Sequence, residues 1–557
     1  MSTLAAAQLQ SRDFIVIGGY FALMLGIGAY FFRYMRGMSD FFTGGNRIPW
    51  WLSGVSFYMT SFSAFAFVAY SALAFKYGFV AVTLYWVTVP AVFIGAVWIA
   101  GRWRRARIVS PVEFLEQRYG LATRQTFAWA NVPVRMVDNG LKLLAIGTIV
   151  SVGLGFDMAQ SILISGLIIL AYTFMGGLWA VTVTDFLQFL VMIVGVIILV
   201  PLSIAKLPDG LAKLPSQVPE GFFSLTAEER PWPFVLVFFA VMLLQYNSNF
   251  ALVQRYYCVA DEKAARKVGL LMTVLSFLSP PIFFFPAMAA RVFLPEAEPA
   301  TIYATLCAEL LPSGFLGLMV AAMFAATMSA LSSEYNVMAS VLTNDVYRRL
   351  FRPDAGDKQL VWVGRLMTLL IGAVALVLPL ALVYTESDKG LFDKMVKLFG
   401  VAGTPIAVPM LAGLLWRRTT HAGALAGFMA GVAVGLALFF FGAPFIPVAL
   451  TTIAVTLAAL ITASLCERPG KSEHLRREQF FEKLDKPVTF DPPPATTTRP
   501  MMPLRIVGIS TALVGVLLLS ILPGMAWGAG TQINLAAGVV LLIGGVLMAV
   551  WGGTQEA

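Results

Sequence analysis

Charged residues are scarce in this chain of 557 residues. Asp, Glu, Lys and Arg together make up 12% of it, whereas 59% of the residues are hydrophobic. The mean hydropathy is +0.80. Soluble domains carry about 25% charged residues. The composition therefore excludes a soluble globular protein and predicts a polytopic membrane protein.

Cysteine and histidine are almost absent. The three scattered cysteines, Cys258, Cys307 and Cys466, exclude a disulfide framework and a cysteine-rich metal cluster. Only two histidines, His421 and His474, are present, so the paired His, Asp or Cys ligands of a membrane-embedded hydrolase are missing. We therefore expect neither an enzyme nor a resident cofactor.

The chain instead holds a long series of apolar runs, each near the length of about 20 residues that crosses a bilayer as a helix. Since the N-terminus lacks the basic flank and cleavage site of a signal peptide, we expect the first run to be retained. The pattern predicts an all-α membrane protein with about fifteen transmembrane helices. The runs are 13–32, 50–74, 78–101, 126–153, 158–179, 183–204, 233–253, 268–291, 313–343, 360–384, 394–416, 420–441, 445–465, 502–522 and 534–553.

Basic residues are concentrated in alternate loops, for example at 102–107, 348–352 and 417–418. The positive-inside rule assigns these loops to the cytoplasm. With an odd number of spans, the N-terminus lies outside and the C-terminus inside a plasma (inner) membrane. This asymmetry explains the net charge of +9, so the charge gives no reason to expect a nucleic-acid partner. The lipid bilayer is the expected partner, and the oligomeric state stays open.

Hydroxyls cluster inside one apolar run. Ser329, Ser332 and Ser333 are spaced i, i+3 and i+4, so they share one helix face. Hard oxygen ligands at membrane depth suit a small alkali cation, and the cluster predicts part of an ion site. The alternative is that each serine bonds back to a carbonyl of its own helix or eases helix packing.

Two other runs have a polar patch in the middle, at 59–63 and at 245–249. Helices that are broken around a site at the bilayer midplane carry such patches, because unwound backbone frees carbonyls for a cation. The alternative for each patch is hydrogen bonding to neighbouring helices. Because the patches occupy corresponding positions in two halves of the chain, we expect broken helices.

Five stretches occur in a fixed order. They are Ser39 to Phe42 before Trp50 and Trp51; Ser110 to Gly120; Gly176 to Val181 followed by Thr184, Asp185 and Gln188; Gln254 with Arg255; and Ala326 to Asp345. Together they resemble the sodium/solute symporter family, which contains bacterial sodium-coupled sugar, proline and sialic acid carriers. The resemblance covers roughly residues 10–465.

The resemblance implies a fold of two inverted five-helix repeats of the sodium-symporter type with flanking helices. It divides the chain into a leading helix with a cytoplasmic entry loop (1–49), a first repeat (50–204), an outer loop (205–232), a second repeat (233–416), two peripheral helices (417–465), a cytoplasmic linker (466–501) and two C-terminal helices (502–557). The linker is charged and then rich in proline and threonine.

The resemblance also implies cation ligands. The family's usual site falls on the carbonyls of Met59, Phe62 and Ala326 and on the hydroxyl of Ser329, but Ala330 replaces its second hydroxyl. A second arrangement in the family uses an aspartate, and it falls on Asp185, Ser329, Ser332 and Ser333, all of which are present. The alternative role of Asp185 is to cap its helix.

The substrate positions that the resemblance implies are centred on Asp138. An ionised group at mid-membrane is normally paired or functional, and the alternative role for Asp138 is an i, i+4 ion pair with Lys142. Sialic acid carriers of the family bind the carboxylate of their solute with an arginine on the helix that corresponds to the one with Asp138. No arginine stands at that position here, which disfavours sialic acid. The substrate candidates are Ser61, Tyr85, Thr88, Asp138, Asn249 and Ser276.

These features favour a cation-coupled secondary symporter, with sodium as the coupling ion, that imports a small polar organic solute by alternating access. One alternative is a proton-coupled or uncoupled transporter of the same fold, because Ala330 removes a ligand and because Asp138, Asp185 and Glu334 are acidic. A remote alternative is a transporter-like membrane sensor, although residues 466–557 hold only a linker and two spans. The identity of the solute stays open.

Overall fold

The computed structural model describes residues 9–32, 42–175, 177–383, 390–488 and 503–554. Within these ranges every regular element is a helix. Twelve helices are long and apolar enough to cross a membrane, and two bent helix pairs raise the number to 14. The apolar helix Met158–Phe174 accounts for the fifteenth predicted segment. The prediction of an all-α polytopic membrane protein is confirmed.

The elements up to residue 248 include the first predicted repeat. They are α1 (Ser11–Phe32), η1 (Gly44–Asn46), α3 (Trp50–Ser61), η2 (Ala66–Tyr70), α4 (Ser71–Tyr77), α5 (Val80–Trp86), α6 (Thr88–Ile94), η3 (Gly95–Ile99), α7 (Ala100–Arg105), α8 (Pro111–Tyr119), α9 (Leu121–Leu154), α10 (Met158–Met175), α11 (Leu178–Ala205), η4 (Leu211–Lys213), α12 (Leu214–Gln217) and α13 (Trp232–Ser248).

The remaining elements complete the second predicted repeat and its flanking helices. They are α14 (Phe250–Tyr257), α15 (Glu262–Phe293), α16 (Ile302–Leu310), α17 (Phe315–Val341), η5 (Leu342–Phe351), α18 (Asp357–Val383), α19 (Leu391–Leu398), η6 (Phe399–Gly403), α20 (Thr404–Leu415), α21 (His421–Phe440), α22 (Phe445–Cys466), α23 (Lys471–Asp485), α24 (Pro503–Ser520), η7 (Leu522–Gly524) and α25 (Ala529–Thr554).

Both predicted helix breaks are present. The pair Trp50–Ser61 and Ala66–Tyr77 bends by 58°, and the pair Trp232–Ser248 and Phe250–Tyr257 bends by 54°. At the second break the Asn249 side chain accepts hydrogen bonds from the amides of Ala251 and Leu252, and so caps α14. The expectation of broken helices is therefore confirmed.

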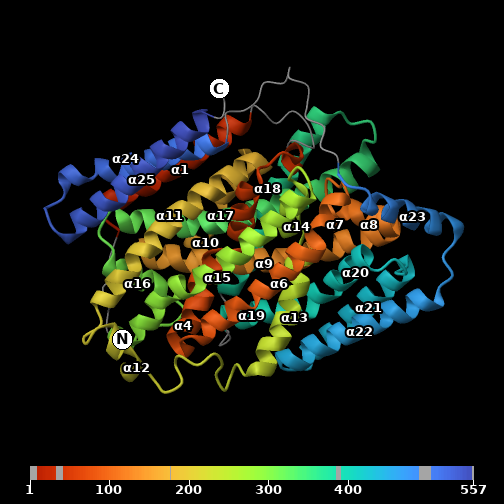
Figure 1. Ribbon diagram of the computed structural model, residues 1–557, viewed down its shortest axis with the longest axis horizontal. Helices are drawn as coiled ribbons and strands as arrows, with labels where there is room; N and C mark the ends of the chain where they lie inside the picture. Colours follow the sequence, from red (N-terminus) through yellow and green to blue (C-terminus); the bar gives the residue numbers. More distant parts are fainter. Residues whose placement is uncertain (1–8, 33–41, 176, 384–389, 489–502, 555–557) are drawn as a thin grey trace.

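Helix α17 lies at the centre, and all of its residues are buried. It packs against α1, α3, α9 and α11, and Figure 1 shows α1, α9 and α11 close to it. Its N-terminus is capped by Asp13 of α1, whose Oδ1 accepts hydrogen bonds from the amides of Gly314 at 2.6 Å and Gly317 at 2.8 Å. The leading helix thus satisfies amides that the start of α17 leaves open.

The segment that was expected to be a linker contains helix α23, which its polar composition did not predict. Phe480, Phe481 and Leu484 of α23 are buried. Phe480 packs edge-on against Phe114 of α8, with ring centroids 5.5 Å apart. In Figure 1, α23 lies beside α7 and α8, whereas α24 and α25 form a pair beside α1. Residues 489–501 of the expected linker lie outside the described residues.

Candidate functional site

The polar side chains of the predicted site gather where the two broken helices meet α11 and α17. Asp185 of α11 is fully buried. Because α11 begins at Leu178, Asp185 lies two turns inside the helix, so its interpretation as a helix cap is wrong. Its Oδ2 accepts a hydrogen bond from Ser56 of α3, whereas Oδ1 has no hydrogen-bond partner in the described structure.

Arg255 of α14 places a fixed positive charge beside Asp185. Its side chain is fully buried, and its Nη2 lies 3.9 Å from Asp185 Oδ2. The same nitrogen donates to the hydroxyls of Ser333 at 2.7 Å and Thr60 at 3.0 Å. Sequence reasoning used Arg255 as part of a family motif and counted it among the basic residues of a cytoplasmic loop. The second assignment is wrong, because the guanidinium is buried within the proposed set of cation ligands.

The three serines of the predicted cluster on α17 differ in their hydrogen bonds. Ser332 donates back to the carbonyl of Ser329 at 3.1 Å, as the alternative interpretation expected of serines in membrane helices. Ser333 accepts from Arg255. The hydroxyl of Ser329 is buried and faces the Asp185 carboxylate, but the two groups do not form a well-aligned hydrogen bond, and no other described residue pairs with the hydroxyl. A buried polar atom without a partner costs about 1–3 kcal/mol, so Ser329 is a candidate ligand for a guest.

The carbonyls that were predicted as cation ligands lie at the end of α3 and on α17. Helix α3 ends at Ser61, and Phe62 follows in an extended conformation. The last carbonyls of a helix have no partner within it, which leaves Met59 and Phe62 suited to the predicted role. Thr327 accepts a hydrogen bond from the amide of Ala64 at 2.9 Å. This bond holds the break that follows α3 next to Ala326 of α17.

A cavity of about 90 Å³ lies beside both helix breaks. Four of the six predicted substrate residues line it: Ser61, Tyr85, Asp138 and Asn249. Sequence reasoning did not assign the other polar lining residues to the site. They are Thr60, Ser63, Tyr70, Lys142, Gln245, Tyr246 and Glu334. Several of these belong to the two polar patches, so the patches were the signal that could have found them.

Thr88 and Ser276 are not among the residues that line this cavity. The Thr88 hydroxyl donates to the carbonyl of Tyr85 at 2.8 Å, and Ser276 Oγ lies 3.6 Å from the sulfur of Met272. Both side chains are buried. Each hydroxyl therefore serves its own stretch of helix in this structure.

Charged side chains of alternating sign lie on and behind one wall of the cavity, and Arg135 is the member that does not line it. Asp138 lies 2.9 Å from Lys142 Nζ and 3.5 Å from Arg135 Nη1. Arg135 lies 3.7 Å from Glu334 Oε1, which accepts a hydrogen bond from Asn249 at 3.1 Å. The predicted Asp138–Lys142 pair is present and lines the cavity. Sequence reasoning missed Arg135, although a charge within the apolar run 126–153 was a usable signal.

Aromatic and charged residues separate this cavity from a depression of about 540 Å³ on the expected outer side. Tyr70 packs against Phe392 of α19, with ring centroids 5.3 Å apart. Asp393 of α19 pairs with Arg230 at 2.6 Å. Since Met395 lines the cavity and Phe392 lines the depression, α19 forms the partition between them.

Comparison with known proteins is consistent with this geometry. The sodium:solute symporter family model matches residues 41–431, about seven-tenths of the chain. The chain belongs to this family. The family match contains both helix breaks, α11 and α17, whereas α22 to α25 follow its last matched residue.

Relatives of this protein align with it along most of their own length. The sodium/sialic acid symporter SiaT of Proteus mirabilis is 25% identical over 482 residues, which cover 81% of this chain and 95% of that protein. The sodium/glucose cotransporter of Vibrio parahaemolyticus is 25% identical, with 81% and 90% covered. The solved outward-open structure of a Na⁺-coupled sialic acid symporter has a TM-score of 0.74 at 22% identity, covering 83% of this chain and 99% of that one. The expected symporter fold is therefore confirmed.

Proposed function

We propose that the protein is a sodium-coupled symporter that imports a small polar organic solute by alternating access. The observation that carries this proposal is the position of Ser329 and Asp185, two buried groups that face each other without a well-formed hydrogen bond, near a polar cavity at two helix breaks. Both ligands can then bias the same conformational change, which couples the ion to the solute.

In this proposal the sodium ion is held by Ser329, by Asp185 and by the carbonyls of Met59, Phe62 and Ala326. The carboxylate supports it, because an acidic ligand binds a cation more strongly than hydroxyls do in a medium of low dielectric, and Asp185 carries this charge beside the buried Arg255. Ser332 and Ser333 are committed to Ser329 and Arg255. Ser332 donates in its bond and keeps its lone pairs for a cation, whereas Ser333 would become a ligand only if its bond to Arg255 opened.

The solute site is proposed to use Ser61, Tyr85, Asp138 and Asn249, together with Lys142. These groups offer both donors and acceptors, which suits a solute with several hydroxyl groups. Relatives named for glucose and myo-inositol support this assignment. The Tyr85 hydroxyl is buried beside that of Tyr58 without a well-aligned hydrogen bond, so it can turn to a solute.

The proposed orientation places the N-terminus outside and the C-terminus in the cytoplasm. The packing of the basic loops supports it, because they meet at one end of the molecule. Arg105 and Arg417 both contact α23, at Leu484 and Asp485 respectively, and Arg349 pairs with Glu116 of α8. Loops that alternate in the chain therefore share one face, as the positive-inside rule requires.

Thermal unfolding of the purified protein tests the ligands directly. A panel of sugars, polyols, amino acids and carboxylates is added in sodium or in potassium buffer. We expect a solute to raise the unfolding temperature, and to raise it more in sodium, because two coupled ligands stabilise one state. Equal stabilisation in sodium and potassium, with a dependence on pH instead, would favour the proton-coupled alternative.

A further inference from the structure

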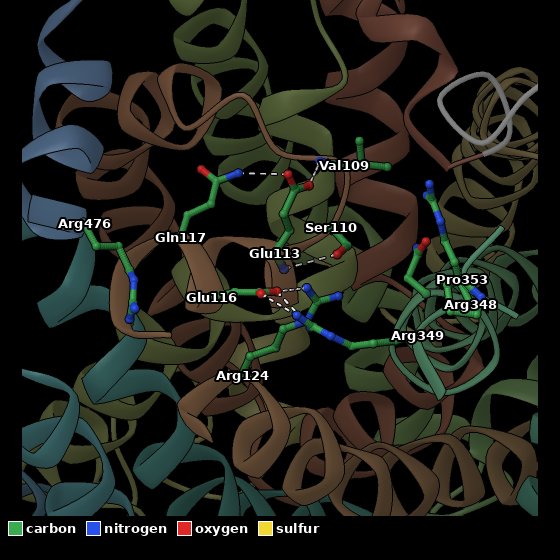
Figure 2. A pocket seen from close by; sticks show the side chains of 11 residues that line it. Val109, Ser110, Glu113, Glu116, Gln117, Arg124, Arg348, Arg349, Pro353 and Arg476 are labelled. Atoms are coloured by element: carbon green, nitrogen blue, oxygen red, sulfur yellow. Dashed lines mark hydrogen bonds and ion pairs between the residues drawn. The ribbon is translucent and has the colours of Figure 1, made fainter. Parts of the chain in front are cut away.

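A second cavity lies at the proposed cytoplasmic end of the molecule, well apart from the solute site. Its volume is about 750 Å³. It is formed by α8, the start of α9, the end of η5 and one side chain of α23, as Figure 2 shows. Its lining residues are Val109, Ser110, Glu113, Glu116, Gln117, Arg124, Asn344, Arg348, Arg349, Pro353 and Arg476.

The charges on this lining are strongly unequal. Four arginines and two glutamates face the cavity, which leaves an excess of two positive charges. The arginines come from three separate parts of the fold: Arg124 from α9, Arg348 and Arg349 from η5, and Arg476 from α23. Convergence of cationic side chains from distant parts of the chain distinguishes this cavity from an ordinary row of surface charge.

Both glutamates are already engaged within the wall. Glu116 pairs with Arg124 and, at 2.8 Å, with Arg349. These hydrogen bonds lower the pKa of Glu116 to about 2, so the carboxylate stays ionised and holds the two guanidinium groups in place. Glu113 accepts from the Val109 amide and from Gln117, both at 2.8 Å. Figure 2 shows the side chains of Arg124 and Arg349 converging on Glu116.

Arg476 is built into the wall by close packing. Its Nη1 donates to the carbonyl of Tyr119 at 3.0 Å. The backbone of Gly120 (φ +107) leaves the room for it, because a Cβ at this position would lie 2.2 Å from that nitrogen. Arg348 lies at the exposed rim of the cavity. Arg476 is thus held on one wall, while Arg348 can reorient toward a ligand.

We propose that this cavity is a binding site for a phosphate group, either on a free phosphorylated compound or on an anionic lipid headgroup. A phosphate monoester carries about −1.5 to −2 charges at neutral pH, which matches the excess of two positive charges. Guanidinium groups bind phosphate oxygens through paired N–H donors. The site is separate from the transported solute, so it does not depend on the proposed function.

A phosphate bound in this cavity would contact two elements, η5 and α23, that belong to different parts of the fold. Arg348 lies in η5, which continues α17, the helix of the proposed sodium site, whereas Arg476 lies in α23, beyond the family match. A ligand that contacts both would stabilise the packing of α23 against the end of α17. Binding of phosphate would therefore determine how firmly α23 is packed against the rest of the protein.

The test uses the full-length protein in detergent, at constant sodium concentration. Thermal unfolding is followed while potassium pyrophosphate replaces potassium chloride at equal ionic strength. In parallel, native mass spectrometry counts the phosphatidylglycerol molecules that stay bound. The test variant is Arg348→Gln. The matched control is Arg352→Gln, which removes an exposed arginine of the same segment that does not line the cavity.

We expect pyrophosphate to stabilise the wild type and the Arg352→Gln variant, and its apparent affinity to fall at least about tenfold in the Arg348→Gln variant. If pyrophosphate has no effect but phosphatidylglycerol is retained in an Arg348-dependent way, the phosphate belongs to a lipid. Where Arg348→Gln fails to fold, Arg476→Gln replaces it. The proposal is overturned if neither probe binds, or if binding is the same in the test and control variants.

Discussion

The guanidinium of Arg255 donates a hydrogen bond of 2.7 Å to Ser333, and it lies 3.9 Å from Asp185. A protein cation thus stands inside the set of oxygens that sequence reasoning assigned to a metal cation. The pair links α14, at the second helix break, to α17. Because the conformation of this link depends on the charge around Asp185, the link can report whether a sodium ion is present.

The first prediction concerns the charge of Asp185. Asp185→Asn should weaken the apparent affinity for sodium at least about tenfold, because it removes the only carboxylate that is proposed to face the ion. It should also lower thermal stability, since Arg255 loses a buried counter-charge. Sodium titration of the unfolding temperature measures the first effect separately from the second. An unchanged sodium midpoint would exclude Asp185 as a ligand.

Ala330→Ser is the matched variant on the neighbouring helix. Ala330 is fully buried on α17, and a hydroxyl there restores the ligand that the family's usual site contains. We expect the sodium affinity to stay the same or to increase, with a small loss of stability from the added atom. The same sodium titration checks it. A marked loss of sodium affinity would contradict this expectation and would mean that the added hydroxyl disturbs the ion site without serving as a ligand.

The second prediction separates the two roles of Asp138. Because its carboxylate pairs with Lys142 at 2.9 Å, Asp138→Asn should strand a partly buried cation and lower the unfolding temperature. If Asp138 also contacts the solute, the variant should show a higher half-saturation concentration for uptake. The double variant Asp138→Asn with Lys142→Met should recover the stability. Recovery of transport as well would show that Asp138 is structural only.

A contact in the site could be predicted from the sequence when the two residues that form it lie close together in the chain. The Asp138–Lys142 pair is local, since i, i+4 spacing fixes it, and it was predicted. The helix breaks were also predicted, because polar runs in apolar helices carry a local signal. Arg135 meets Glu334, and Arg255 meets Ser333, only through the packing of separate helices, so no local pattern indicates them. Helix α23 was missed because its buried face consists of only Phe480, Phe481 and Leu484.

The third prediction concerns the cap on α17. Asp13→Ala removes the acceptor for the amides of Gly314 and Gly317, and should cost about 1–2 kcal/mol of stability. The matched control is Asp157→Ala, which removes an exposed carboxylate that accepts from the Ala159 amide near the start of α10. Thermal unfolding should show a larger loss for Asp13→Ala. Equal losses would mean that the α1 contact does not hold α17 in place.

The fourth prediction tests the second helix break. Asn249→Ala removes the cap of α14 and the hydrogen bond to Glu334. We expect both lower stability, by about 1 kcal/mol, and weaker solute binding, because Asn249 lines the cavity. Asn249→Asp keeps the cap acceptor but places a carboxylate beside Glu334. Solute titration of both variants distinguishes them: if the two bind solute as the wild type does, Asn249 acts only in folding.

The central claim, sodium-coupled import, is tested most directly by uptake into proteoliposomes that contain the purified protein and a solute selected by thermal stabilisation. A sodium gradient directed inward should drive accumulation of the solute above its external concentration, and dissipating that gradient should abolish it. Asp185→Asn should shift the sodium dependence to higher concentrations. Accumulation that proceeds equally well without sodium, and that follows an imposed proton gradient instead, would contradict the account.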